Sequence, residues 1–497
     1  MLGKATEERP NESRIMSTAT IVLLIIMVVA TGNLSRQSEY LNKTVSTGSV
    51  RSNFSQYNLL ADSLLKGEVA LDLDVSQDLA NLSNPYSYED RQKMIEDNPD
   101  AFYYFDTAFY NSKYYCYFGV VPALLFFLPF KEVTGCDLAT TDLVIFLSCL
   151  FVLASYMFIR LFFIKNRTIN KCLPLVLVAF VLSCNIMQLV YFPAFYSVPI
   201  VLGLDLTLLG LSLWKCSADS LDLNPIFMFF GSLSMAAVFG CRPQLGIGSL
   251  AAFYIFRDPL KEGRIFSKQN PGKVVAAVAP YLLVFIGLGL YNFERFGSFL
   301  DFGASYNLTG FDMTKYSQSW FLSISLILSY LFEPIKLSSS FPFVEGYSPL
   351  LGDLNSNNFA PNEPIPCGYF WLYPVILISI LYALSKLKQR DRSLLIVMFV
   401  AALVVLVFDC RNAGISWRYF ADFGWIFAIT ACWGISKIPC FNCFISLNRL
   451  KVFLGTLVAL TLAITGFSLF SASVTRLIVS VNVARPYLYT VVSNFFS

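Results

Sequence analysis

The chain has 497 residues, of which 56% are hydrophobic and 14% charged, against about 25% charged residues in soluble domains. Its mean hydropathy is +0.59. Polar residues cannot cover so much apolar surface in water, which excludes a soluble enzyme, a disordered chain, a coiled coil and a disulfide scaffold. An all-α polytopic membrane protein is predicted. The net charge of +3 is too balanced to indicate nucleic-acid binding. The absence of histidine removes the commonest general base and metal ligand.

About 11 apolar runs are candidates for transmembrane helices, each of which needs about 20 residues. The first, from Ser17 to Asn33, is long for a signal-peptide core, and no small-residue cleavage site clearly follows it. It therefore predicts an uncleaved anchor. The other runs cover 141–164, 172–191, 197–214, 226–241, 244–256, 274–292, 367–386, 394–410, 416–436 and 451–471.

Two further apolar stretches, 117–130 and 320–334, are assigned from the charges of the connecting loops. Short loops rich in Lys and Arg stay on the cytoplasmic side of a membrane. The basic loops at 165–171, 257–273, 386–392 and 437–451 lie on the side of the N-terminus only if neither stretch crosses. We therefore expect two helices in the outer interface. The same topology requires a hairpin over 226–256 that turns at Arg242-Pro243.

This map predicts one integrated membrane domain over residues 1–497, with the N-terminus in the cytoplasm. Segment 34–140 is expected to form a large first extracytoplasmic loop with an interfacial helix, and 293–366 a second extracytoplasmic insertion. The expected location is the plasma membrane, and in a bacterium the cytoplasmic membrane.

Polar residues that could carry chemistry gather in four clusters on the expected extracytoplasmic face. An arginine fork binds phosphate, aromatic faces stack on sugar rings, and a carboxylate can act as a base. The mixture of these residue types indicates a ligand with an anionic phosphate and a sugar. The clusters are Asp106–Gly119, Arg242-Pro243, Tyr291–Tyr306, and Arg411 with 417–422.

Three of these clusters carry a family resemblance. The matching residues are Asp106 through Lys113-Tyr-Tyr to Pro122, Tyr291-Asn292 through Arg295-Phe-Gly to Tyr306, and Arg418-Tyr419 with Asp422. In this order they resemble bacterial GT-C glycosyltransferases, and more narrowly membrane proteins near the dolichyl-phosphate-mannose protein mannosyltransferase family. Asn84-Pro85-Tyr86, with Arg91 following, also fits the first loop of such proteins. The resemblance covers about 55–425 and implies a GT-C-like fold with its active site on the extracytoplasmic face.

The resemblance also implies a catalytic base. In that family an acidic residue of the first external loop has this role, often soon after the first span. Residues 52–58 contain no acid here; the nearest acids are Glu39 and Asp62, and Asp72 and Asp74 are further alternatives. Asp106 is the preferred candidate because it lies in the best-matching run. The structural alternative for Asp106 is a surface loop acid or a helix cap.

The substrate-binding candidates are the cationic, amide and tyrosine side chains of the same clusters: Lys113, Tyr114, Tyr115, Arg242, Asn292, Arg295, Arg418 and Tyr419. The arginines would contact the carrier phosphate, and the lysine and tyrosines would position the phosphate or the sugar. Each has a structural alternative. The tyrosines could form an interface belt, Arg242 and Arg418 could mark the membrane boundary, and Arg295 could pair with Glu294.

No cofactor and no metal ligand are assigned. A divalent metal is the alternative, because Asp72 and Asp74 share one face if their segment is a strand. The twelve cysteines are scattered, and Cys440 and Cys443 form the only close pair. With no second pair and no histidine, a zinc site is not expected.

The sequence thus predicts a membrane glycosyltransferase that moves a sugar from a polyprenyl-phosphate carrier to a lipid, glycan or protein acceptor, with inversion and a carboxylate base. The other expected partners are membrane lipids, and no nucleic acid. The rival hypothesis is a transporter or flippase of lipid-linked glycans. Transporters place several charges inside the membrane, whereas Asp205 is the one acid deep in an apolar run here.

Overall fold

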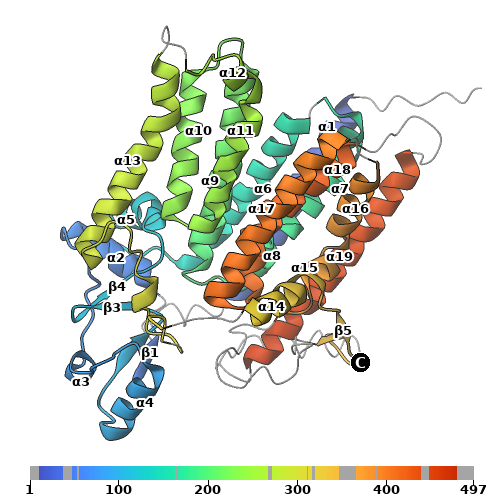
Figure 1. Cartoon of the computed structure of the whole chain (residues 1–497). Helices are drawn as coiled ribbons and strands as arrows, with labels where there is room; N and C mark the ends of the chain where they lie inside the picture. The colour runs from blue at the N-terminus through green and yellow to red at the C-terminus, as the bar shows by residue number, and fades with distance from the viewer. Residues whose placement is uncertain are drawn as a thin grey trace, which may run out of the picture. The chain divides into compact units, whose positions relative to one another are not determined.

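The computed structural model describes residues 10–36, 48–52, 55–163, 165–266, 271–310, 312–315, 320–345, 365–386, 389–437 and 447–477. Helices dominate this part of the chain (Figure 1). The chain divides into two compact units, each assembled from separated segments. Unit 1 holds Met1–Leu34, Ser148–Tyr191 and Trp320–Ser497, and unit 2 holds Ser35–Leu147 and Phe192–Ser319. Our expectation of one integrated membrane domain stays a prediction.

Unit 1 is built around α18 (Phe420–Ser436), which packs against α7 (Arg167–Ser183), α16 (Pro374–Lys386) and α17 (Gln389–Ala413). Nearly every residue of α18 is buried, as expected for a helix surrounded by others. The remaining elements are α1 (Pro10–Arg36), the C-terminal part of α6 (Thr140–Phe163), α8 (Ile186–Tyr191), α14 (Trp320–Phe332), β5 (Lys336–Leu337), β6 (Val344–Glu345), α15 (Tyr369–Leu372), η6 (Trp417–Tyr419) and α19 (Leu447–Leu477).

Unit 2 combines packed helices with a small mixed region. Helix α10 (Pro225–Ala237) packs against α9 (Ser197–Asp219) and α13 (Pro271–Phe296). The smaller elements before them are β1 (Val50–Ser52), α2 (Gln56–Leu65), α3 (Gln77–Ala80), α4 (Tyr88–Asp97), β2 (Tyr103–Phe105), β3 (Ala108–Tyr110), β4 (Lys113–Tyr115), η2 (Ala123–Phe127) and α5 (Leu128–Thr134). Those after α10 are η3 (Val238–Gly240), η4 (Pro243–Leu250), α11 (Ala251–Ile255), α12 (Arg257–Lys261) and η5 (Ala304–Tyr306).

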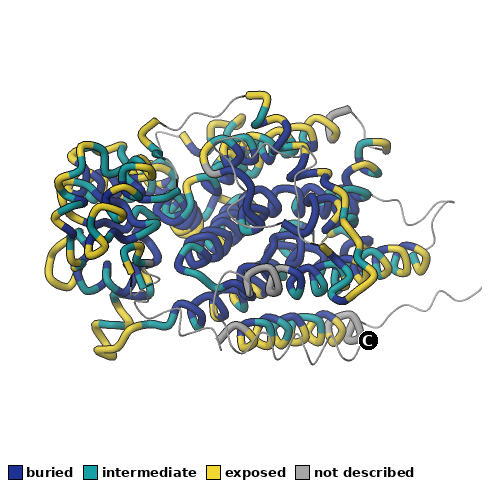
Figure 2. The backbone as a smooth tube through the Cα atoms, turned by 90° about the horizontal axis from the view of Figure 1, so that it is seen from below, coloured by how far each residue is buried: buried dark blue, intermediate teal, exposed yellow. Residues whose placement is uncertain are grey.

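Within the described residues, six helices are long and apolar enough to cross a membrane: Ile15–Leu34, Thr140–Phe163, Ser197–Asp219, Pro271–Phe296, Arg392–Asn412 and Leu447–Ser471. All six coincide with predicted spans, and the protein is an integral membrane protein. Figure 2 shows buried and exposed residues interleaved along such helices. In Pro271–Phe296 only 22% of the apolar window is buried by protein, so most of its apolar side chains need a non-aqueous surrounding.

The other five predicted spans fall on shorter or interrupted helices, and their crossing stays a prediction. The run 172–191 divides between α7 and α8, because Asn185 between them has φ 61°, a left-handed conformation that asparagine tolerates. The predicted hairpin over 226–256 turns just before Pro243, the first residue of η4. Its second arm is not one long helix but the 3₁₀ helix η4 followed by the five-residue α11.

Both stretches predicted to lie in the interface form helices too short to cross a bilayer. Residues 117–130 end in the π-helical turn η2 and the seven-residue α5, and 320–334 contain the 13-residue α14. At about 1.5 Å per residue, neither spans the roughly 30 Å of hydrocarbon. The pair Cys440 and Cys443 lies outside the described residues, as does the chain after 477.

Candidate active site

Asp106 lies at a sharp turn of unit 2, between β2 and β3. Its φ is 58°, a left-handed value that aspartate adopts more readily than most residues. The next turn, between β3 and β4, uses Asn111 (φ 49°) and Ser112 (φ 55°). Two successive positive φ angles give the type I′ turn that favours a tight hairpin. The local sequence therefore holds Asp106 on a short, stiff double turn.

The Asp106 carboxylate is half-buried and accepts two hydrogen bonds on one oxygen. The Tyr117 hydroxyl donates to Oδ1 at 3.0 Å, and Nδ2 of Asn307 donates to the same atom at 2.8 Å. Its backbone carbonyl accepts from Nε2 of Gln56 at 2.8 Å. Gln56 is 0% exposed and Asn307 is 7% exposed. The carboxylate is thus oriented by fixed neighbours, as a base that acts on a bound hydroxyl needs to be.

The two predicted insertions contact each other at this carboxylate. Asp106 donates its backbone N–H to the carbonyl of Leu308 at 3.0 Å, and Leu308 donates to the carbonyl of Thr107 at 3.1 Å. The fully buried guanidinium of Arg91 adds hydrogen bonds to the carbonyls of Pro85 and Thr309. Segments about 200 residues apart in sequence are therefore joined in one body around Asp106.

Arg295 is a buried guanidinium at the end of α13. It is 4% exposed and donates to the Cys116 carbonyl at 2.7 Å and to Oδ1 of Asn292 at 2.6 Å. Its guanidinium carbon also lies 4.0 Å from the ring centre of Tyr291. Glu294 is exposed, and within the described residues Arg295 has no carboxylate partner. The alternative of a structural ion pair between the two is therefore wrong.

Cys116 follows the hairpin of β3 and β4 that begins at the Asp106 turn, and its carbonyl accepts from Arg295. Burial raises the pKa of its thiol to about 12, an effect that the charge of Asp106 strengthens and that of Arg295 opposes. Nε of Arg295 is buried and has no hydrogen-bond partner among the described residues. An unbalanced buried cation is costly, and an anion placed beside it would recover part of that cost.

Arg242 lies two residues after Gly240, whose backbone is in close contact with Gly119 in the segment that follows Cys116. A Cβ on Gly119 would lie 2.1 Å from the carbonyl oxygen of Gly240, so only glycine fits there. The Tyr57 hydroxyl donates to the Gly119 carbonyl at 3.2 Å. Burial raises the pKa of Tyr57 well above its usual value, while nearby Arg242 lowers it. Arg242 itself precedes η4 with an extended backbone.

The three residues of β4 occupy different environments. Lys113 is exposed. Tyr115 is 5% exposed and packs on Phe296. Its neighbour's predicted contact with substrate stays a prediction: Tyr114 is 0% exposed, with its ring 5.1 Å from that of Tyr104. The alternation of a strand sends it into the core of the loop region.

Arg418 and Tyr419 belong to unit 1, in η6. Nη2 of Arg418 donates to the Tyr419 hydroxyl at 3.3 Å, and the guanidinium carbon lies 5.0 Å from the tyrosine ring centre. Their predicted role in substrate binding stays a prediction.

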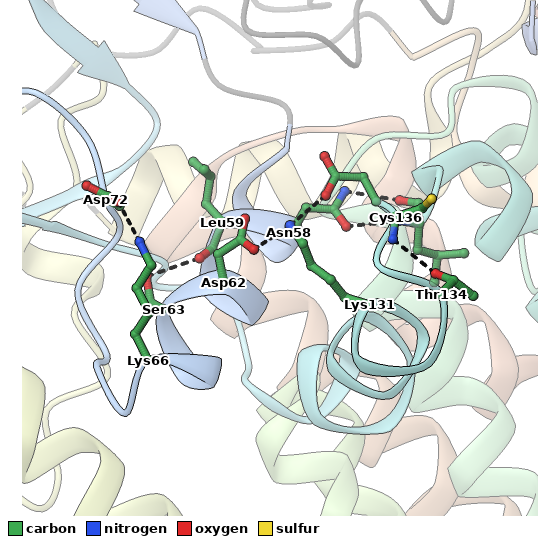
Figure 3. Close-up of polar contacts among 11 residues, drawn as sticks. Asn58, Leu59, Asp62, Ser63, Lys66, Asp72, Lys131, Thr134 and Cys136 are labelled. Carbon is green, nitrogen blue, oxygen red and sulfur yellow. Dashed lines mark hydrogen bonds and ion pairs between the residues drawn. The ribbon is translucent and has the colours of Figure 1, made fainter.

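Sequence reasoning missed helix α2, which carries several positioning side chains. Gln56 holds Asp106, and Asn58 exchanges two hydrogen bonds of 3.1 Å with the backbone of Leu138. Figure 3 shows Asp62 of the same helix facing Lys131, which also pairs with Asp137 at 2.7 Å. Helix α2 thereby ties α5 to the Asp106 turn. The only signal for this helix in the sequence was the polar pair Gln56 and Asn58 beside apolar residues.

The alternative metal site has little support in its surroundings. Asp72 is 73% exposed and pairs with Lys66 at 2.8 Å, as Figure 3 shows. Asp74 is exposed, and only Leu71 of this segment forms a bridge, to Tyr114. Among the described residues, no group of three or more His, Cys, Asp or Glu side chains could hold a metal ion.

Comparison with known proteins gives a distant structural similarity. No family model matches the chain, and no curated protein matches it. Among solved structures it is similar to ArnT from Cupriavidus metallidurans, which was crystallised bound to undecaprenyl phosphate. The two are 12% identical, the alignment covers 96% of this chain and 75% of that chain, and the TM-score is 0.44. At this level of similarity, functional conclusions have to rest on the residues of this chain.

Proposed function

We propose that this protein is an inverting membrane glycosyltransferase that takes a sugar from a polyprenyl-phosphate carrier and passes it to an extracytoplasmic acceptor. The observation that carries the proposal is the presence, within unit 2, of an oriented carboxylate, Asp106, and a buried guanidinium, Arg295, that has no carboxylate partner among the described residues. Arg295 donates to the carbonyl of Cys116, which lies ten residues after Asp106 in the same loop region. The motif resemblance over both insertions supports the same reaction class.

In the proposed reaction, a hydroxyl oxygen of the acceptor attacks the anomeric carbon of the sugar. The bond from that carbon to the phosphate oxygen breaks, and the phosphate leaves with the bonding electrons. Asp106 takes the hydroxyl proton, and Arg295 faces the charge that develops on the phosphate. Electrostatic stabilisation of this kind often supplies the largest part of catalysis. A single displacement with one base inverts the anomeric configuration.

Arg242 and Lys113 have supporting roles in the proposal. In this proposal Arg242, whose charge lowers the pKa of nearby Tyr57, adds positive charge beside the phosphate. Exposed Lys113 is placed to attract the anionic carrier rather than to contact the reacting atoms. Attraction by an exposed charge is screened within about 10 Å at 0.1 M salt.

The test is transfer from radiolabelled polyprenyl-phosphate sugars by membranes that contain wild type, Asp106→Asn or Asp106→Glu. General-base catalysis typically contributes about 10²–10⁴-fold, so Asp106→Asn should lose at least that much transfer while retaining its level in the membrane. Asp106→Glu should keep more activity than Asp106→Asn. A chelator arm separates a metal-dependent reaction from one run by the side chains alone.

The matched control is Asp72→Asn, which removes an exposed carboxylate from the same loop region. It should leave transfer near wild type. Near-normal transfer by Asp106→Asn would refute the base assignment. Failure of the correctly inserted wild type across the whole panel of donors would refute the transferase and favour the transporter hypothesis.

A further inference from the structure

A cluster of tyrosines beside the Asp106 turn has no part in the reaction as derived. Tyr110 at the end of β3 and Tyr306 in η5 have ring centres 4.7 Å apart, and Tyr86 lies 5.8 Å from Tyr306. All three are half-buried, which leaves part of each side chain open. Beneath them Phe296 is 3% exposed and touches both Tyr110 and Tyr306. The three tyrosines therefore form a packed aromatic surface above the buried Phe296 ring.

Ring packing and one hydrogen bond restrain the orientation of the tyrosines. The Tyr86 hydroxyl donates to the Phe109 carbonyl at 3.1 Å. Burial raises the pKa of Tyr306 to about 12, and nearby Asp301, whose Oδ1 accepts from the Gly303 N–H at 2.8 Å, raises it further. A ring held in this way loses little conformational freedom when a ligand binds.

Carboxylates lie around the same surface. The charges of both Asp301 and Asp312 act on Tyr86, whose pKa is raised to about 12, mainly by burial. Asp312 also accepts from Nδ2 of Asn84 at 2.9 Å. Aromatic faces surrounded by acceptor oxygens match the chemistry of a pyranose, which presents C–H groups on one face and hydroxyl donors at its edge.

The surface is continuous with the Asp106 carboxylate. Asn307, which directly follows Tyr306 in the chain, donates to Asp106. Tyr117, the other donor to that carboxylate, packs against the same hydrophobic cluster as Tyr110 and Tyr306. A ring bound to the tyrosines would therefore lie beside the group that is proposed to remove the acceptor proton.

We propose that Tyr86, Tyr110 and Tyr306 form an acceptor subsite that binds a pyranose ring, so that the acceptor is a glycan and not a peptide or a simple phospholipid. The acceptor role rests on the proposed transferase function. The binding of a saccharide does not rest on it, and the two can fail separately.

The experiment is saturation-transfer NMR on the full chain in nanodiscs of phosphatidylcholine and phosphatidylglycerol, which have no sugar headgroups. The probes are maltotriose and tri-N-acetylchitotriose. Binding in the millimolar range, about 1–10 mM, is expected. Tyr306→Ala and Tyr86→Ala should each lower affinity about 3- to 10-fold, the size of one aromatic contact. Tyr306→Phe keeps the ring and should bind about as well as wild type.

The matched control is Tyr88→Ala, which removes a 39%-exposed tyrosine from the neighbouring helix α4 and should leave binding unchanged. Circular dichroism and thermal unfolding show whether each variant is folded. No saturation transfer from either trisaccharide, or equal transfer in all folded variants, overturns the subsite. Saccharide binding without glycosyl transfer would support the subsite and refute the transferase. Glycosyl transfer without saccharide binding would support the transferase and refute the subsite.

Discussion

Replacing Arg295 by lysine separates a phosphate-binding role from a structural one. Lysine keeps the positive charge but loses the planar fork that donates to the Cys116 carbonyl and to Asn292. A hydrogen bond to a charged group is worth about 1.5–3 kcal/mol. If one such bond to the leaving phosphate is lost in the transition state, kcat/KM falls about 10- to 150-fold.

The same substitution also affects stability, because the Cys116 carbonyl and Asn292 lose a buried donor. An unsatisfied buried polar group costs about 1–3 kcal/mol, so Tm should fall as well. The assay therefore measures kcat/KM for the polyprenyl-phosphate donor per folded molecule. Size exclusion and the melting curve of each variant give the folded fraction at the assay temperature.

Arg91→Lys is the matched control for this prediction. Arg91 is likewise buried, donates to two backbone carbonyls and has a buried Nε that finds no hydrogen-bond partner in the described part of the chain. Arg91→Lys should lower Tm and leave kcat/KM per folded molecule within a few-fold of wild type. An equal loss of kcat/KM in both variants, or none in Arg295→Lys, would refute the reasoning.

Three further substitutions test the construction of the site. Lys131→Met should destabilise the fold by about 0.5–1 kcal/mol, because it removes the ion pairs with Asp62 and Asp137. Burial lowers the pKa of Lys131, but its hydrogen bonds to Asp137 and Asp62 outweigh burial, so the pKa is raised. This stabilisation is complete below the unfolded-state pKa near 10.5 and is lost as pH rises through the folded value, so wild-type and variant melting temperatures should converge above pH 10.5. Gly119→Ala should cost about 3 kcal/mol or more, because its Cβ would overlap the Gly240 carbonyl; the readout is Tm. Asn292→Ala should lower kcat/KM about 10-fold through a less fixed guanidinium, and rescue by Asn292→Gln would support a positioning role.

The controls for these variants come from nearby positions. Gly287→Ala adds a Cβ to α13 where no atom lies within 4 Å, so it should not lower Tm. Lys66→Met removes a lysine from an exposed ion pair and should change stability less than Lys131→Met. A Gly119→Ala variant as stable as Gly287→Ala would contradict the close contact with η3, and melting curves that stay apart at high pH would contradict the Lys131 ion pairs.

The sequence by itself determined the class of protein and the positions of its long helices. Apolar runs are local signals, because a span must satisfy its own backbone hydrogen bonds within one segment. It also singled out Asp106 and Arg295 as candidates, from the polar clusters at the expected membrane boundary and the family resemblance of their motifs. It could not exclude an ion pair for Arg295, because the direction of a side chain at a helix end depends on what packs there.

Only the tertiary structure decided the neighbours of these charges. Gln56 and Asn307 are 50 and 201 residues from Asp106 in the chain, yet both hold it, and no local pattern reports a contact across such a distance. Likewise Tyr114 and Tyr115 are adjacent in sequence, but the pleat of β4 turns one into the loop core and the other onto Phe296. Composition and periodicity fix which segments are buried in the membrane, whereas the geometry of a polar site depends on long-range packing.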